Sequence, residues 1–286
     1  MEVESSHLAG LIPISGQELD FDMPWHDSMQ PLNKNYLAVE HAVLECAMAG
    51  CNTIWIACGD DFQPLIKKRL GEYVLDPVWS NRTYSKFPEE HKKYIPIFYV
   101  PIHSKDLDKR DCLSWGAIYA AQIAYRVSMS LSKWVTPSKY YVSFPYGVYD
   151  FAFLRKHRDI LQKKNVLLTY EDKSVINNEY LSFTFGVEEF LEFRRIIRKG
   201  TGIISPGKYE KKEKLPLSER WSARHFAVEK VFEPLRQRSE SEIGVEEYHN
   251  ISNWDGYCGY IKSDLDLKRP EEKVFIGRKT NGRIST

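Results

Sequence analysis

Leu8-Ala-Gly-Leu-Ile-Pro-Ile-Ser-Gly16 is a short apolar run that ends in glycine, and the fold can be worked out by starting from it. Such a run predicts a buried strand followed by a sharp turn. The run Asn52-Thr-Ile-Trp-Ile-Ala-Cys58 repeats this pattern and stops at Gly59. Between them, a polar loop over 17–35 precedes residues 36–49, which place apolar side chains near helical spacing before Gly50. The sequence therefore begins with a strand, a helix and a second strand.

The same alternation continues through the first half of the chain. We expect further strands over 94–100 and 139–144, and helices over 63–73, 115–131 and 151–163. Strands that alternate with helices predict an α/β fold with a mixed, mainly parallel sheet and helices on both faces. The strands are apolar throughout, which fits burial on both sides of the sheet.

The rhythm changes near residue 165, and this change predicts the domain organisation. Two β-rich runs, 166–170 and 179–185, are separated by turn residues and followed by helices over 187–198 and 223–235. Residues 199–219 predict a surface excursion. We expect an α/β core over 1–165, a β-rich continuation with helical insertions over 166–261, and a tail over 262–286 that could dock protein partners.

Composition limits the classes of function. Forty Lys and Arg side chains balance 39 Asp and Glu side chains, so the net charge is +1 and nucleic acid is an unlikely partner. No apolar run approaches the ~20 residues of a membrane span, and Met-Glu-Val-Glu-Ser-Ser is not a signal peptide. Five cysteines without Cys-x-x-Cys spacing predict reduced, buried thiols. We expect a soluble, cytoplasmic protein that does not contact membranes.

This order of elements resembles the sugar-nucleotide nucleotidyltransferase family, which includes glucose-1-phosphate uridylyl- and thymidylyltransferases. In that family an N-terminal strand leads into a glycine-rich loop, a Pro-Lys-x-Leu segment and a helix. Residues 11–16, Met29-Gln-Pro-Leu32 and the helix that ends at Gly50 follow this succession. Ser114-Trp-Gly-Ala-Ile-Tyr-Ala-Ala121 is similar to the family's Gly-Thr-Ala-x-Ala helix. The resemblance covers 8–165 and implies a Rossmann-like fold of the GT-A kind.

The resemblance implies transfer of a nucleotidyl group from a nucleoside triphosphate to a sugar phosphate, or use of a nucleotide sugar. In the family, backbone N–H groups of the loop hold the triphosphate, an Arg and a Lys balance its charge, and an Asp holds Mg²⁺. In this chain the candidate for the catalytic, magnesium-binding carboxylate is Asp150, and Lys34 is the candidate for a second catalytic residue, each as a replacement for a family residue absent from its usual position. The implied nucleotide-binding residues are Gly16, Gln17, Gly59, Ser114, Gly116, Tyr146 and Gly147.

The chain departs from the family at all three charged positions, so its active site is degenerate. Asp20 stands where the family has Arg, Gln30 stands where it has Lys, and no carboxylate follows the strand over 139–144 before Asp150. Lys34 or His26 is a candidate replacement for the lost cation. Whether the protein is an enzyme is therefore open.

Two alternatives to the nucleotidyltransferase remain at this point. One is a catalytically inactive descendant that serves as a structural or assembly protein, since divergent copies of this type are similar to proteins encoded by large tailed phages. Such a protein would act in the host cytoplasm or in the virion. The other alternative is a GT-A glycosyltransferase, which would need a pair of acids near Asp150.

Other polar residues follow the predicted strands. Asp60 and Asp61 come directly after the second strand, and we expect one of them to cap the helix that begins at Gln63. His103, Asp106 and Asp108 follow the third strand, on the ligand-binding edge of such a sheet. The eight histidines lack the spacing of a histidine metal site.

Overall fold

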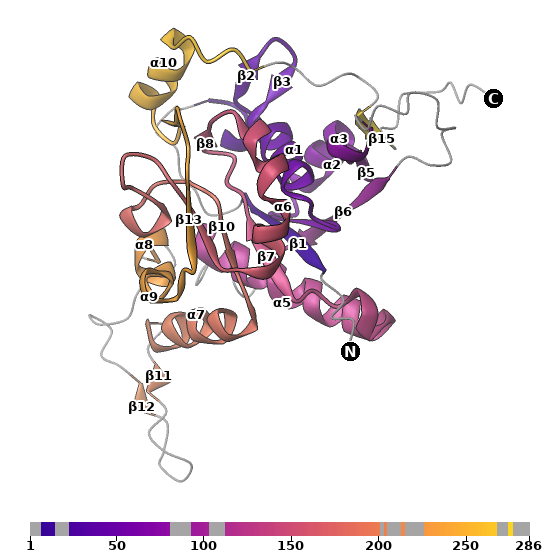
Figure 1. Ribbon diagram of the computed structural model, residues 1–286, viewed down its shortest axis with the longest axis vertical. Helices are drawn as coiled ribbons and strands as arrows, with labels where there is room; N and C mark the ends of the chain where they lie inside the picture. The colour runs from indigo at the N-terminus through magenta and orange to yellow at the C-terminus, as the bar shows by residue number, and fades with distance from the viewer. Residues whose placement is uncertain are drawn as a thin grey trace, which may run out of the picture.

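The computed structural model describes residues 7–14, 23–80, 93–102, 112–200, 203–204, 213–214, 226–267 and 274–276. Within these residues, one sheet of nine strands runs in the order β13-β9-β10-β7-β1-β4-β6-β5-β15 (Figure 1). Its centre is β1 (Leu8–Pro13), which pairs in parallel with β4 (Thr53–Cys58) and β7 (Lys139–Val142). β6 (Tyr94–Pro101) continues the parallel part beside β4. The mainly parallel sheet predicted from the sequence is therefore confirmed.

At each end of the parallel part, further strands of mixed direction extend the sheet. β10 (Phe183–Phe185) is antiparallel to β7 and to β9 (Val166–Thr169), and β13 (Ser241–Gly244) is parallel to β9. On the other side, β5 (Tyr73–Leu75) is antiparallel to both β6 and β15 (Phe275–Ile276). The β-rich residues after 165 thus add strands to the same sheet, and β15 of the predicted tail joins it too. The domain boundaries at 165 and 261 stay predictions.

Alternating residues of the central strands face two separate hydrophobic clusters. Ile12, Ile54 and Ile56 belong to one cluster with α1 (Ala38–Ala49), α2 (Gln63–Leu70) and α6 (Leu154–Lys163). Leu11, Trp55 and Ala57 belong to the other with α5 (Leu113–Leu131), α7 (Val187–Gly200), α8 (Val228–Phe232) and α9 (Leu235–Arg238). Helices therefore cover both faces of the sheet, as predicted (Figure 1). Of the helices that the structure describes, none combines the length and apolar character of a membrane span.

Several helices are shorter than predicted, because their first or last residues form turns or short strands instead. The first helix begins at Ala38 because Tyr36–Leu37 forms β3, which pairs with β2 (Pro31–Asn33). α2 ends at Leu70, since Gly71 has a φ of +83° that suits glycine. The predicted helix over 223–235 is α8 followed by a turn and α9, with 223–225 outside the described residues.

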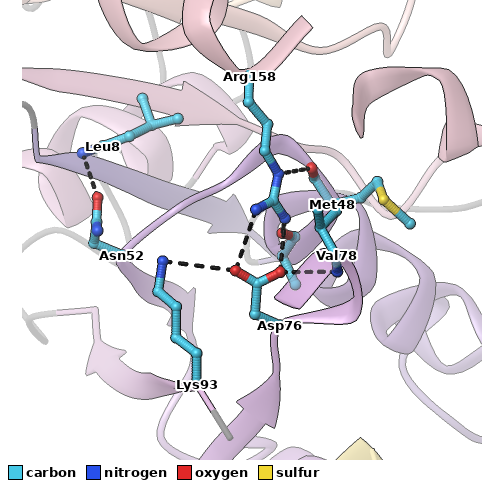
Figure 2. Close-up of polar contacts among 8 residues, drawn as sticks. Leu8, Met48, Asn52, Asp76, Val78, Lys93 and Arg158 are labelled. Atoms are coloured by element: carbon cyan, nitrogen blue, oxygen red, sulfur yellow. Dashed lines mark hydrogen bonds and ion pairs between the residues drawn. The ribbon is translucent and has the colours of Figure 1, made fainter. Parts of the chain in front are cut away.

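A buried ion pair ties the end of α1 to its neighbours (Figure 2). Nε and Nη2 of Arg158, on α6, donate to the carbonyl oxygens of Met48 and Ala47, and both terminal nitrogens donate to Asp76. Asp76 is 1% exposed, accepts the N–H of Val78 and lies 3.6 Å from Nζ of Lys93. One guanidinium therefore joins α1, α6 and the segment between β5 and α3 (Pro77–Ser80).

Candidate functional site

Three parallel strands end together, and their backbones stay paired one residue beyond each strand. Ile14 N–H donates to Ala57 at 2.9 Å, Ser143 N–H to Leu11 at 3.0 Å, and Ile102 N–H to Cys58 at 3.1 Å. The loops that follow leave from the carboxyl edge of the sheet, where ligands of open α/β sheets bind.

Two sets of predicted site residues follow these strands but lie outside the described residues. Gly16, Gln17 and Asp20 follow β1 but lie outside the described residues. His103, Asp106 and Asp108 follow β6 and lie outside them as well. Their roles stay predictions.

The first turn of α5 packs directly against this edge. A Cβ on Gly116 would lie 3.1 Å from Cβ of Pro13 and 3.7 Å from Cβ of Ala57, so the helix backbone approaches β1 and β4 closely. Ser114 is fully buried, and its Oγ donates to the carbonyl of Phe226 at 3.2 Å. The structure thus brings Gly116 and Ser114 to the predicted edge, with the Ser114 hydroxyl engaged by another part of the core.

Tyr146 reaches the end of β1, and both Tyr146 and its neighbour Gly147 are covered by other parts of the protein. The hydroxyl of buried Tyr146 donates to the carbonyl of Ile14 at 3.3 Å. Gly147, in β8 (Gly147–Val148), pairs with Asn250 of β14 (His249–Asn250). A Cβ at Gly147 would lie 2.0 Å from the carbonyl oxygen of Tyr180, so backbone fills the space beside it. Nucleotide contacts by these two residues stay predictions.

Asp150 and Lys34 occupy exposed positions on separate segments. Asp150 Oδ1 accepts the N–H of Ala152 at 2.8 Å and caps the short helix η4 (Phe151–Phe153). Lys34 lies in the turn between β2 and β3, where its N–H donates to Asn33 Oδ1. Within the described residues, the two proposed catalytic side chains do not form a hydrogen bond or ion pair with each other.

The magnesium ion implied by the resemblance has one candidate ligand in the described residues. Mg²⁺ prefers octahedral oxygen ligands, and proteins often supply one or two carboxylates while substrate phosphates supply the rest. Nowhere in the described ranges do three His, Cys, Asp or Glu side chains converge to hold a metal ion. Asp150 would act alone, with one oxygen already accepting the Ala152 N–H. Its role as a metal ligand therefore stays a prediction.

The end of β4 shows an arrangement that the sequence did not indicate. Asp60 and Asp61 are exposed. The N-cap residue of α2 is Phe62, which makes no side-chain cap bond, while Asp61 Oδ1 accepts only the N–H of Phe62. The expected capping of α2 by Asp60 or Asp61 is therefore wrong, because a turn separates both acids from the first helical residues. Gly59 directly follows β4, and the ring of Phe62 packs against His26 with centroids 4.7 Å apart.

His26 does not replace the missing cation at neutral pH. Its Nδ1 accepts the N–H of Ser28 at 3.2 Å and lies 2.9 Å from Ser28 Oγ. Burial lowers the pKa of His26 to about 4, against the opposing charge of Asp61. Of the two replacements suggested by the sequence, His26 is therefore excluded at neutral pH.

Below the carboxyl end of β7 lies a buried polar cluster that sequence reasoning also missed. Glu45, on α1, is fully buried and accepts hydrogen bonds from Tyr141 (2.5 Å), Tyr149 (2.6 Å), Ser143 (2.7 Å) and Ser182. Burial raises the pKa of Glu45, and the four hydroxyl donors act against that rise. A glutamate inside the apolar run 42–49 was the one available signal.

His41 lies one turn before Glu45 on the same helix. Its Nδ1 is 3.0 Å from the hydroxyl of Tyr36, and its ring lies 4.8 Å from that of Phe151. Among the described residues, no group makes a well-aligned hydrogen bond with its Nε2. Burial lowers the pKa of His41 to about 3, against a weaker opposing effect of the Tyr149 backbone. His41 is therefore a neutral core residue.

Comparisons with known proteins identify the fold. No protein-family model and no curated protein matches the sequence. A protein named as a glucose-1-phosphate thymidylyltransferase from Bacillus anthracis, solved in complex with sucrose, matches at a TM-score of 0.54 and 8% identity. The match covers 92% of this chain and 98% of that one. A UDP-glucose pyrophosphorylase complexed with UDP-glucose follows at a TM-score of 0.49 and 13% identity, over 89% and 97% of the two chains. The chain has a sugar-nucleotidyltransferase-like fold.

Proposed function

We propose that this chain is a nucleotidyltransferase-like protein that binds a nucleoside triphosphate or a nucleotide sugar at the carboxyl edge of its sheet. The observation that carries the proposal is the close packing of Gly116 against Pro13 and Ala57. It places the start of the 19-residue helix α5 beside the ends of β1 and β4. A helix N-terminus favours anionic groups such as phosphates, and the ends of parallel strands are where such folds bind nucleotides.

Nucleotidyl transfer would require charge neutralisation and alignment at this edge. In the expected reaction a sugar phosphate attacks the α-phosphate of the triphosphate. We assign Lys34 to balancing phosphate charge and Asp150 to holding Mg²⁺, which would enter with the phosphates. Both residues would replace family residues that are missing at their usual positions, where Gln30 stands in place of Lys and no carboxylate precedes Asp150.

A non-catalytic descendant is the second candidate, and specific contacts favour it. Asp60 and Asp61 expose carboxylates at the edge without an ion-pair partner in the described residues, His26 is neutral, and backbone covers Gly147. An exposed acid opposes a triphosphate. Such a protein would keep the scaffold for binding or assembly, for example in a phage particle. A glycosyltransferase is the third candidate; it would need a pair of acids near Asp150, whereas the adjacent acids Asp60 and Asp61 follow β4.

A ligand screen followed by turnover measurements tests these candidates. Thermal unfolding would be measured with UTP, dTTP and UDP-glucose, each with and without Mg²⁺. A ligand at 100 times its dissociation constant stabilises the native state by about 2.7 kcal/mol, which gives a clear shift. A nucleotide-binding protein shows a shift with at least one of these ligands. If none shifts the transition and Asp20→Arg restores no binding, the proposal is wrong.

Pyrophosphate release from a nucleoside triphosphate and glucose-1-phosphate then separates the first two candidates. For an active enzyme we expect Asp150→Asn to reduce turnover at least a hundredfold with the fold intact. Asp159→Asn, an exposed acid on α6, is the matched control and should leave turnover unchanged. Binding without turnover supports the non-catalytic descendant. Turnover that ignores Asp150→Asn shows that the carboxylate is not the metal ligand.

A further inference from the structure

The end of α1 brings two cysteines together. Gly50 has a φ of +91°, its N–H donates to the carbonyl of Ala47 at 3.2 Å, and the N–H of Cys51 donates to the carbonyl of Cys46 at 3.1 Å. These two bonds define a Schellman cap. In this cap, the side chain four residues before the left-handed glycine contacts the side chain directly after it. Here those two side chains are Cys46 and Cys51.

Two further observations show that the sulfur atoms are neighbours. The side chain of Cys51 is close enough to Cys46 to raise the pKa of the Cys46 thiol. A Cβ on Gly10 of β1 would lie 2.9 Å from Sγ of Cys46 and 3.2 Å from Sγ of Cys51. Both sulfurs therefore lie over the same backbone position of the central strand, and the glycine there leaves room for them.

We propose that Cys46 and Cys51 form an oxidisable dithiol that closes to an intramolecular disulfide in the folded protein. The two thiols lose two protons and two electrons, and one S–S bond forms. An azo oxidant such as diamide accepts both electrons and both protons, so that its N=N bond becomes the N–N bond of a hydrazine. In the reverse direction a thiol reductant supplies two electrons and two protons and restores both thiols.

The other three cysteines provide the controls. Cys58 and Cys112 are buried and free, and Cys258 on α10 (Trp254–Lys262) is partly exposed. The partly exposed thiol of Cys258 would react first, by adding to diamide and then forming a disulfide with a second chain, so the experiment uses the Cys258→Ser chain. Residues 35–67 contain no Lys or Arg before Lys67, so Cys46, Cys51 and Cys58 share one tryptic peptide. Cys58→Ala in the same background therefore decides which pair has closed.

Burial sets the conditions of the experiment. Both thiols are fully buried, and burial, followed by the neighbouring Cys51 side chain, raises the pKa of Cys46 well above its ordinary value. Since the thiolate is the nucleophile, closure should be slow and should become faster at higher pH. The folded Cys258→Ser chain would be incubated with diamide at pH 8 for hours, with a urea-unfolded sample alongside, and measured by intact-mass spectrometry.

We expect the folded chain to lose 2 Da, to regain them with dithiothreitol, and to lose them again in the Cys58→Ala variant. The loss should disappear in Cys51→Ala and in Cys46→Ala. Circular dichroism shows whether these two variants are folded. If they are not, the mass changes of the Cys258→Ser chain and of its Cys58→Ala variant decide the test. The proposal is overturned if the folded parent chain keeps its mass while the unfolded chain loses 2 Da. It is overturned equally if Cys58→Ala abolishes the loss.

Discussion

Two acidic regions lie near the carboxyl ends of two parallel strands, β7 and β4, and they differ in what surrounds the carboxylates. Glu45 is fully buried below β7 and accepts hydrogen bonds from four hydroxyl groups. Asp60 and Asp61 follow β4, are exposed, and pair with no cation in the described residues. The Glu45 carboxylate is fully engaged by hydrogen bonds within the protein, whereas Asp60 and Asp61 are accessible to solvent and ligands.

The contrast indicates which carboxylates contribute to the free energy of folding and which are accessible to a ligand. A buried carboxylate costs several kcal/mol unless donors surround it, so the donors of Glu45 are part of the folding free energy. An exposed carboxylate keeps its hydration and contributes little to folding. Substitutions in the Glu45 cluster should therefore change stability, and substitutions at the end of β4 should change ligand binding.

The largest effect is expected for Glu45→Ala. Removing the carboxylate leaves the hydroxyls of Tyr141, Tyr149, Ser143 and Ser182 without their acceptor, and we expect a loss of about 3–5 kcal/mol in unfolding free energy. Urea unfolding followed by circular dichroism measures it. Asp60→Ala is the control from the other region and should stay within about 0.5 kcal/mol. Equal effects of the two substitutions would remove the distinction between the regions.

The next effect concerns His41, which belongs to the buried region. Its pKa is about 3 in the folded protein and near 6.5 when unfolded, so between these values the unfolded chain binds more protons. The unfolding free energy therefore falls as the pH drops from 6.5 toward 4, by roughly 3 kcal/mol from this residue. Urea unfolding across this range should show a shallower pH dependence in His41→Gln than in the wild type. Parallel curves would show that His41 is not buried in its neutral form.

A smaller loss is expected for Arg158→Met, which tests a buried charge held by an ion pair and not by hydroxyls. Asp76 would lose two hydrogen bonds, and the carbonyls of Ala47 and Met48 their donor, while Lys93 remains nearby. We expect a loss of about 2 kcal/mol. Arg155→Met, at an exposed position of the same helix, is the control in the same urea experiment. A loss below that of the control would show that the pair contributes no net stability.

The smallest effect on folding is expected for Asp61→Asn, which sharpens the comparison from the exposed side. The unfolding free energy should change by less than about 0.5 kcal/mol, since the side chain makes one exposed hydrogen bond. If the edge binds phosphates, loss of the negative charge should strengthen UTP binding about two- to fivefold at low salt. Titration of the thermal transition measures this, with Asp172→Asn in an exposed turn as control. Weaker binding would mean that Asp61 contacts the ligand directly.

The candidate site could be predicted only where local patterns decide it. The resemblance of residues 114–121 to the family's Gly-Thr-Ala-x-Ala helix implies Gly116, and the structure places this residue against β1. The partners of Glu45 lie 96 to 137 residues away in sequence, so no local pattern shows that they converge. The turn that makes Phe62 the N-cap residue of α2, in place of Asp60 or Asp61, also depends on its surroundings, because an aspartate is the usual choice at an N-cap.

The sequence by itself determined the alternation of strands and helices, the parallel centre of the sheet and its burial on both faces. These properties follow from apolar periodicity and from glycine at the ends of the elements, which act over a few residues. The tertiary structure alone decided that the strands after 165 join the same sheet, that Glu45 is enclosed by four hydroxyls, and that Cys46 meets Cys51 over Gly10. Each of these depends on segments far apart in the chain, whose contacts form only when burial brings them together.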